Sequence, residues 1–531
     1  MNKQVYDLAI IGGGINGCGI ARDAAGRGLK VLLVEQNDLA SATSSWSSKL
    51  IHGGLRYLEQ YEFRLVREAL QEREVLLKIA PHLIKPLEFI LPHDAHMRPA
   101  WMIRLGLWMY DHIGGTISLP RSRGVTFPDK IYSAGLKPSI KRGFFYSDAK
   151  VDDARLTLLN ALSARALGAD IRTRTKLVAG MRAGMRASDA NDVADNEISN
   201  NANNATWRLI LQDSDSGEKS TVEARGVVNA AGPWVKHLLD DTFDITIDAK
   251  VKLVKGSHIV VPRIHPESHA YILQNFDKRV VFIIPYQDKF SLIGTTDVDV
   301  DSIDDAAHIS DAETQYLLAA ANRFTAKTIR ESEIVWSYAG VRPLYDDGAA
   351  TASEITRDYV LKTDHVDGKL PLLSIFGGKI TTYRRLAEHA LDDLKPFYPA
   401  MRAPWTSVPA LPGGDVTAID SLLREIAQSQ PTLPIDYLRQ LVNRHGTRTA
   451  MLLANVASMR DLGECFGAGA YLLSEREIDF CIAHEFARRP DDILWRRTKC
   501  GLHMDAAERL RAAEFIQARV VALGTNQNKK P

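Results

Sequence analysis

The first 35 residues of the chain contain the feature that most restricts its fold. Residues 5–11 form an apolar run, a GGGING turn follows, residues 15–27 have helical character, and residues 30–35 form a second apolar run, KVLLVE. A strand, a helix and a second strand in this order make a βαβ unit, whose two strands lie in a parallel sheet. The sequence therefore predicts an α/β domain at the N-terminal end.

The turn itself has the spacing of a dinucleotide-binding motif. Gly12, Gly14 and Gly17 give G-x-G-x-x-G between the predicted strand and helix, and Glu35 ends the next strand. In this motif the first glycine permits the tight turn, the second leaves room for a pyrophosphate, and the third lets helix and strand pack closely. The acidic residue accepts hydrogen bonds from a ribose. The motif does not distinguish NAD from FAD, and a glycine-rich turn without a ligand is the less favoured alternative.

Composition narrows the class of protein. The chain has 531 residues, of which 45% are hydrophobic and 25% charged, with a net charge of +1. This length predicts two or more domains, and the balanced charge does not favour a nucleic-acid partner. The cysteines form no CxxC pair, so neither disulfides nor a metal site is expected, and a reducing compartment fits. We see no signal peptide and no apolar run long enough to span a bilayer.

Changes in composition along the chain divide it. Residues 181–205 are rich in Asn, Asp, Ala and Ser, which predicts a mobile surface loop. Strand-like runs between 226 and 297 predict a mixed or antiparallel sheet. A Pro- and Gly-rich stretch after Tyr398 precedes patterns that are helical from about residue 416. We therefore expect a catalytic region over 1–404 and a helical C-terminal domain over 405–531.

Several later stretches place basic or hydroxyl side chains beside glycines or strand ends. Residues 39–58 are dense in Ser and Thr, and residues 377–385, GGKITTYRR, join an apolar run to a predicted helix. Taken singly, Ser and Thr are more often turn formers, and an Arg or Lys is more often a surface group. Their clustering beside a second glycine turn favours a site for an anionic ligand.

Together these stretches resemble the FAD-dependent glycerol-3-phosphate dehydrogenases of the bacterial aerobic, membrane-associated type. The matching segments extend over about residues 7–501 and include DLAIIGGGINGCGIARDAAGRG, SSKLIHGGLRYLE, RPAWMIRLGLWMYDH, NAAGPWVK, GVRPL, FGGKITTYR and DDILWRRTKCG. The resemblance implies a glutathione-reductase-like FAD-binding Rossmann domain, an antiparallel-sheet substrate domain and a helical C-terminal domain. The mitochondrial members carry EF-hands and a transit sequence, and their absence here favours a bacterial form.

In such folds an extended FAD contacts the first glycine turn with its pyrophosphate and the second with its isoalloxazine ring. Lys379 then places positive charge beside a flavin that becomes anionic on reduction. The resemblance implies that FAD is bound by Gly12, Gly14, Asn16, Gly17, Glu35, Thr43, Ser44, Ser45, Gly54, Gly377, Gly378, Lys379 and Thr381.

The implied reaction oxidises sn-glycerol 3-phosphate to dihydroxyacetone phosphate by hydride transfer from C2 to N5 of FAD. Arginine suits the substrate phosphate, and the candidates are Arg56, Arg342 and Arg357. A base must take the C2 hydroxyl proton, which favours histidine. We expect His258 to be this base and His52 to contact flavin or substrate.

The resemblance also implies that electrons pass to ubiquinone at the inner face of the bacterial cytoplasmic membrane, and that the enzyme is a cytoplasmic, peripheral homodimer. Residues 99–142 combine a short apolar stretch, containing Trp101 and Trp108, with a basic stretch. With the resemblance, this combination is interpreted as an interfacial anchor, and a core helix followed by a solvated basic segment is the alternative. Two other functions stay open: an amine or amino-acid oxidase of the same fold that uses oxygen, and a non-catalytic flavin redox sensor.

Overall fold

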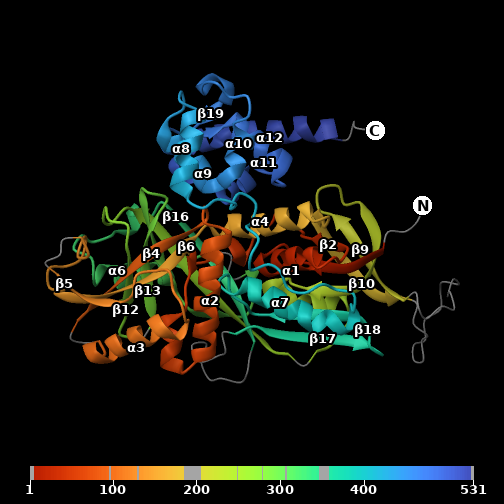
Figure 1. Ribbon diagram of the computed structural model, residues 1–531, viewed down its shortest axis with the longest axis horizontal. Coiled ribbons are helices and arrows are strands. Elements are labelled where there is room, and N and C mark those ends of the chain that lie inside the picture. Colours follow the sequence, from red (N-terminus) through yellow and green to blue (C-terminus); the bar gives the residue numbers. More distant parts are fainter. Residues whose placement is uncertain are drawn as a thin grey trace.

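The chain folds into a two-sheet body covered at one end by helices (Figure 1). The structure, a computed structural model, describes residues 5–94, 97–127, 131–183, 205–247, 249–277, 279–304, 308–345 and 358–527. Of the loop predicted over 181–205, residues 181–183 end a strand and residues 184–204 lie outside the described residues.

The predicted βαβ unit forms the centre of the first sheet. β1 (Val5–Ile11) pairs in parallel with β2 (Val31–Val34), and α1 (Ile15–Gly26) connects them. The parallel strands run in the order β7-β2-β1-β10-β18, with β17 antiparallel to β18 at one edge. The remaining strands of this order are β7 (Asp170–Arg172), β10 (Lys219–Asn229), β18 (Lys369–Phe376) and β17 (Val360–Val366). The antiparallel pair β8 (Thr175–Ala183) and β9 (Thr206–Asp213) extends from β10.

Helices α1, α4 (Asp153–Ala166) and α7 (Tyr383–Leu394) pack together against this sheet. Small residues on α1 make the close approach feasible. A Cβ atom at Gly19 would lie 2.8 Å from the ring of Tyr383, which is fully buried on α7. Gly19, which lies on α1 beyond the glycine turn, therefore permits the close packing of α1 against α7.

The second sheet is mixed and mostly antiparallel, as predicted. Its main path is β15-β11-β14-β13-β12-β4-β6-β3, with β16 on β11 and β5 on β6. The only parallel pair in this path is β12 with β4. The strands are β3 (Leu50–Ile51), β4 (Ile84–His93), β5 (Arg123–Thr126), β6 (Arg142–Val151), β11 (Val251–Pro262), β12 (Ala270–Gln274), β13 (Val280–Tyr286), β14 (Phe290–Gly294), β15 (Val298–Val300) and β16 (Trp336–Tyr345).

Three further helices lie against the second sheet or beside it, and a short one follows β10. α2 (Phe63–Ile79) falls within residues 61–80, whose apolar spacing predicts an amphipathic helix, and α3 (Ala100–Ile113) contains the apolar stretch with two tryptophans. The other two are α5 (Val235–His237) and α6 (Asp311–Asn322).

The C-terminal part is helical, as predicted, and caps one end of the molecule (Figure 1). Its helices are α8 (Ile419–Ser429), α9 (Ile435–His445), α10 (Thr449–Leu452), α11 (Glu475–His484) and α12 (Ala506–Gln527). The pattern of residues 449–458, TAMLLANVAS, predicts a longer helix than is found, because α10 ends at Leu452 and the chain turns through Asn455, whose φ is +62°. A two-stranded sheet, β19 (Cys465–Phe466) with β20 (Leu473–Ser474), was not predicted.

Candidate active site

The first glycine turn has the geometry that its spacing predicts. Gly12 has a φ of +115°, and a Cβ atom there would lie 2.5 Å from the carbonyl oxygen of Ala230. A Cβ atom at Gly17 would lie 2.0 Å from the carbonyl oxygen of Gly12, so any side chain would force helix and turn apart. At Gly14 only the Oγ of Ser44 lies near, at 3.1 Å. Gly12 and Gly17 are therefore closed in by backbone atoms, whereas Gly14 borders a cavity.

The second glycine turn, between β18 and α7, lies directly against the first. Asn16 Nδ2 donates a hydrogen bond of 3.3 Å to the carbonyl oxygen of Gly377. Gly378, with φ +98°, would bring a Cβ atom to 2.8 Å from the same Nδ2. Helix α7 begins only at Tyr383, so Lys379 lies in the turn and not in the first helical turn. Two segments more than 350 residues apart in sequence thus meet at one place.

Two adjoining cavities, together called the cleft below, lie along both turns. One cavity of about 230 Å³ is lined by Gly14 and the residues after it, and a second of about 240 Å³ extends toward the second sheet. The two cavities share the wall residues Ser47, Ser48, Thr295, Arg342, Pro343, Gly377, Gly378, Lys379 and Ile380. The shape is that of a site for one elongated ligand that reaches from the start of α1 to the sheet.

Lys379 carries the positive charge at the middle of this cleft. Its Nζ lies 4.1 Å from the ring centroid of Tyr57, is shielded from solvent, and makes no hydrogen bond to the described residues. The Oδ1 of Asn16 is likewise buried without a hydrogen-bond partner. A buried ammonium group without an acceptor is costly unless a ligand supplies one. These two atoms and the open face of Gly14 fit a bound dinucleotide with an electron-rich ring beside Lys379.

The predicted cofactor residues divide into two groups. Those that line the cleft are Gly14, Asn16, Thr43, Ser44, Gly54, Gly377, Gly378, Lys379 and Thr381. Gly12, Gly17, Glu35 and Ser45 do not line it. Glu35 instead accepts hydrogen bonds from the backbone N–H groups of Gly13 (2.7 Å) and Asn37 (2.8 Å), and burial raises its pKa. Glu35 therefore fixes the glycine turn in this structure, and its contact with a ribose stays a prediction.

The hydroxyl groups after β2 hold the cleft together. Ser44 Oγ accepts a hydrogen bond of 2.9 Å from the N–H of Ile15, at the start of α1. Thr43 Oγ1 donates to the carbonyl oxygen of Val341 (2.7 Å) and so ties this segment to β16. Ser45 faces away from the cleft, and its carbonyl oxygen accepts from Lys49 Nζ (2.8 Å). Ser45 is therefore placed as a structural residue of the turn.

The two candidate histidines occupy different positions. His258, on β11, is 3% exposed and does not line the cleft. Its Nε2 lies 2.9 Å from Ser48 Oγ, its ring stacks on Tyr338, and burial, with lesser effects of Lys49 and Arg342, lowers its pKa to about 3. His52 lines the cleft, and its Nδ1 accepts a hydrogen bond of 3.0 Å from the N–H of Gly54.

Of the three candidate arginines, the structure places one. Arg342, on β16, lines both cavities and pairs with Asp297. The side chain of Arg56 and the whole of Arg357 lie outside the described residues. The guanidinium group has five N–H donors, so Arg342 can hold Asp297 and still present donors to an anion in the cleft.

Two residues that sequence reasoning missed contribute to the cleft. Tyr57 supplies the ring beneath Lys379, and Ser48 connects the cleft to His258. Both lie within residues 39–58, which the sequence singles out because of other residues. Membership in that stretch is the only local sequence signal for them. A third feature, the hydrogen bonds from the N–H of Gly53 to Tyr110 (2.8 Å) and from Tyr110 to Asp148 (2.8 Å), shapes the floor beside His52 and has no local signal.

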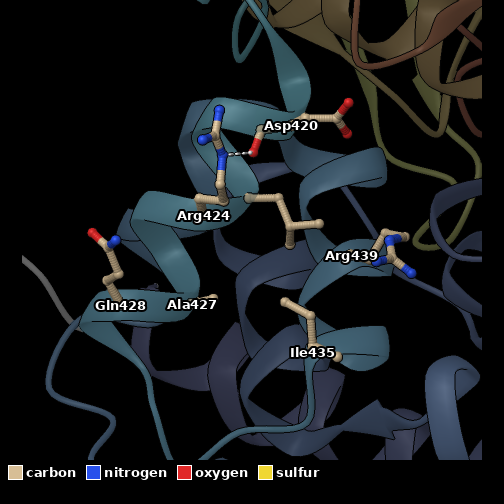
Figure 2. A pocket seen from close by; sticks show the side chains of 7 residues that line it. Asp420, Arg424, Ala427, Gln428, Ile435 and Arg439 are labelled. Carbon is tan, nitrogen blue, oxygen red and sulfur yellow. Dashed lines mark hydrogen bonds between the residues drawn. The ribbon is translucent and has the colours of Figure 1, made fainter.

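A separate hollow between α8 and α9 does not have these properties. Figure 2 shows its wall, with Arg424 Nε donating 3.3 Å to the backbone oxygen of Asp420. Its polar lining side chains, including Gln428 and Arg439, are exposed to solvent. This groove presents no buried polar group to a ligand, so the chemistry is assigned to the cleft.

Comparison with known proteins is consistent with this geometry. Residues 7–384 match the family model of FAD-dependent oxidoreductases, and residues 405–523 match that of the C-terminal domain of alpha-glycerophosphate oxidase. The chain is 49% identical to the aerobic glycerol-3-phosphate dehydrogenase of Escherichia coli, over 97% of both chains. It is 44% identical to the D-erythritol 1-phosphate dehydrogenase of Brucella abortus, over 98% of this chain and 99% of that one.

A solved structure extends the comparison to three dimensions. The glycerol-3-phosphate dehydrogenase of Bacillus halodurans, complexed with FAD, superposes with a TM-score of 0.69 at 25% identity, over 98% of this chain and 95% of that one. The fold predicted from the sequence is confirmed. The chain belongs to the FAD-dependent oxidoreductases and, within them, to the family of the aerobic glycerol-3-phosphate dehydrogenases.

Proposed function

We propose that the chain oxidises sn-glycerol 3-phosphate at C2 to dihydroxyacetone phosphate with FAD as cofactor. The observation that carries the proposal is the single cleft that joins the two glycine turns and contains the buried ammonium group of Lys379. FAD bound there would supply the hydride acceptor for the hydrogen on C2. Side chains of the protein bind and orient the substrate and remove the proton of its C2 hydroxyl group.

Binding and orientation of the substrate fall to the cations of the cleft. Arg342 lines both cavities, as Lys379 does. We assign Arg342 to the substrate phosphate, because its planar group binds a phosphate through two parallel hydrogen bonds. Arg56 and Arg357 stay predictions for the same role, since neither side chain is described.

Two histidines compete for the proton of the C2 hydroxyl. His258 reaches the cleft only through Ser48, and burial keeps its imidazole neutral, so protonating it at pH 7 would cost about 5 kcal/mol. His52 lines the cleft. Its Nδ1 can accept the hydroxyl proton once the hydrogen bond from the N–H of Gly54 is broken. We therefore propose His52 as the base and His258 as a positioning residue for Ser48.

The pH profile of turnover separates these roles. We expect His52→Gln to lose turnover together with the acidic limb of the kcat profile. We expect His258→Asn to lower kcat while leaving the position of that limb unchanged. If His258→Asn removes the acidic limb and His52→Gln keeps it, the assignment of the base reverts to His258.

The electron acceptor is proposed to reach the cleft through its apolar end. The second cavity is walled by Phe89, Tyr146 and Ile272, which belong to one apolar core cluster, and by Phe282, which packs against it. Residues of α3 and the segment before it pack against the same cluster. An apolar wall between the ring site and α3 suits a membrane quinone such as ubiquinone.

That the chain forms a homodimer stays a prediction.

The face proposed to contact the membrane is centred on α3. Trp101 and Trp108 are 66% and 52% exposed. The apolar side chains exposed with them are Tyr61, Phe63, Met102 and Leu105. From the predicted face over 99–142, residues 128–130 lie outside the described residues, and Arg121, Arg123, Lys141 and Arg142 are exposed. Tryptophan beside basic residues is typical of an interfacial anchor. No helix among the described residues is long and apolar enough to cross a bilayer.

Liposome flotation tests this face. The Trp101→Ser/Trp108→Ser double variant is expected to lose most binding to anionic vesicles, whereas Val408→Ser, which changes an exposed valine elsewhere, binds normally. High salt should weaken the wild type in part, because basic side chains contribute to binding. Equal flotation of the double variant and the wild type would exclude this face.

An anaerobic titration tests the reaction. Glycerol 3-phosphate is expected to bleach the flavin absorbance of the purified protein stoichiometrically. A parallel titration with D-erythritol 1-phosphate tests whether a longer polyol phosphate is oxidised. A third titration, with glycine, tests for an amino-acid oxidase. Bleaching by glycine with peroxide formation in air would identify an oxidase. Bound flavin that no polyol phosphate bleaches would identify the redox-sensor alternative.

A further inference from the structure

A second, strongly basic cavity lies between the second sheet and the C-terminal helices. Its volume is about 170 Å³, and it is walled on one side by β4, β6 and the β13–β14 turn and on the other by α9. Figure 1 shows α9 directly above these strands, and Lys85 Nζ on β4 bonds Asn443 Oδ1 on α9 at 2.5 Å. The cavity shares no lining residue with the cleft.

Five cationic side chains line this cavity, and three of them have carboxylate partners. Lys49 pairs with Asp153 at 2.9 Å, Lys499 with Asp152 at 2.6 Å, and Arg444 with Glu477 at 2.8 Å. These pairs account for their own burial, and one of them, Lys499 with Asp152, joins the C-terminal part to the catalytic region. They form the structural frame of the cavity and need no ligand.

The other two cations, Lys85 and Lys150, are not explained in this way. They lie directly opposite each other on the antiparallel strands β4 and β6, so both side chains face the cavity. Among the described residues neither ammonium group forms an ion pair, and the carboxylate that influences Lys150 most, Asp288, makes no direct contact with it. Burial lowers the pKa of both, that of Lys85 to about 8. Like charges in this arrangement destabilise a sheet.

A further polar group in the wall has no partner. His82 is 1% exposed, and neither of its ring nitrogens makes a hydrogen bond to the described residues. The backbone around the cavity is also strained, with positive φ values at Lys49 (58°), Gln287 (45°), Asp288 (56°) and Lys499 (60°). Unpartnered polar groups and strained backbone at one place are a feature of binding sites.

We propose that this cavity binds a phosphate dianion, either inorganic phosphate or the phosphate group of a small monoester. The carboxylate of Asp288 lines the same cavity and offsets part of the charge of the two ammonium groups, and a phosphate, with one to two negative charges near neutral pH, balances the remainder. Lysine binds phosphate as a point charge, and His82 adds a donor. The ligand sits between the sheet and α9, so its binding strengthens the contact between the catalytic region and the C-terminal helices.

Amine labelling with mass spectrometry tests the proposal residue by residue. The holoenzyme is acylated at pH 8 and constant ionic strength, with chloride, inorganic phosphate or glycerol 3-phosphate. Bound phosphate should protect Lys85 and Lys150 roughly tenfold at ten times its Kd. Exposed Lys219 should not change. The stronger protector identifies the source of the phosphate group. Protection no greater than in chloride would overturn the proposal.

A variant separates this site from phosphate binding in the cleft. Lys150→Gln removes one of the opposed charges, and Lys219→Gln is the control with the same change of net charge. In phosphate-free buffer Lys150→Gln should melt at the wild-type temperature or above, because a repulsion is removed. Phosphate should raise the Tm of the wild type and of Lys219→Gln more than that of Lys150→Gln. A lower Tm without phosphate, with equal stabilisation by phosphate, would assign Lys150 a merely structural role.

Discussion

Lys379→Met removes the charge in the cleft while keeping the length of the side chain. The structure makes this a clean perturbation, because Nζ makes no hydrogen bond to the described residues and the methionine sulfur can still pack on the ring of Tyr57. The fold should therefore be unaffected. The lost energy is the attraction between the ammonium group and the negative charge of reduced FAD.

The size of this attraction follows from the burial of Nζ. At an effective dielectric constant of about 20 and a separation of about 4 Å, two unit charges attract by about 4 kcal/mol. For a two-electron couple, about 1.4 kcal/mol corresponds to about 30 mV, so the midpoint potential of FAD should fall by roughly 90 mV. The same 4 kcal/mol applied to the barrier would slow flavin reduction by about a thousandfold.

Two measurements check this prediction on the FAD-loaded protein. Anaerobic dye equilibration gives the potential, and stopped-flow mixing with glycerol 3-phosphate gives the rate of flavin reduction. Lys395→Met, at an exposed lysine just after α7, is the control and should match the wild type. A potential within about 20 mV of the wild type, with a normal rate, would show that Lys379 does not face the ring.

Three other perturbations have defined outcomes. Gly378→Ala forces a Cβ atom onto Asn16 at φ +98° and should cost about 1–3 kcal/mol, seen as loss of FAD on gel filtration. Arg155→Met leaves the buried carboxylate of Glu485 with fewer partners and should cost about 3–5 kcal/mol in guanidinium denaturation. His265 and His269 are buried with pKa values lowered to about 3 and 4, so the unfolded chain binds more protons below pH 6.5. The free energy of unfolding should therefore decrease as the pH is lowered from about 6.5 towards 4, by up to about 1.4 kcal/mol per pH unit for each ring, and less steeply in a double Gln variant.

The local parts of the fold could be predicted from the sequence, and the long-range parts could not. The unit β1-α1-β2 has its apolar runs, its glycines and its acidic residue within 35 positions, so periodicity and turn chemistry determine it. The parallel pairing of β4 with β12 joins residues about 180 positions apart, and no local pattern encodes it. The extent of α10 failed because Asn455 adopts a left-handed conformation inside an apolar pattern that otherwise fits a helix.

The same distinction holds for the site. Both glycine turns were predicted, because each is a local motif whose function lies in its own backbone. The position of His258 could not be predicted, because β11 is buried on both faces from Val254 to Val261 and lacks the polar alternation that would reveal which face the ring occupies. The role of Ser48 depends on that ring and was hidden for the same reason.

The boundary proposed between residues 404 and 405 divides the chain into two parts, but the stability of each part depends on the other. Buried ion pairs cross it: Arg155 with Glu485, Arg497 with Asp38, and Arg174 with Asp492. Each pair sets a catalytic-region charge against a C-terminal one, and a charge left alone at such a site costs several kcal/mol. Asp38 immediately follows the βαβ unit, so Arg497 neutralises a carboxylate beside the cofactor turn. We therefore expect the C-terminal helices to support FAD binding through the folding of the catalytic region, although none of their described residues lines the cleft.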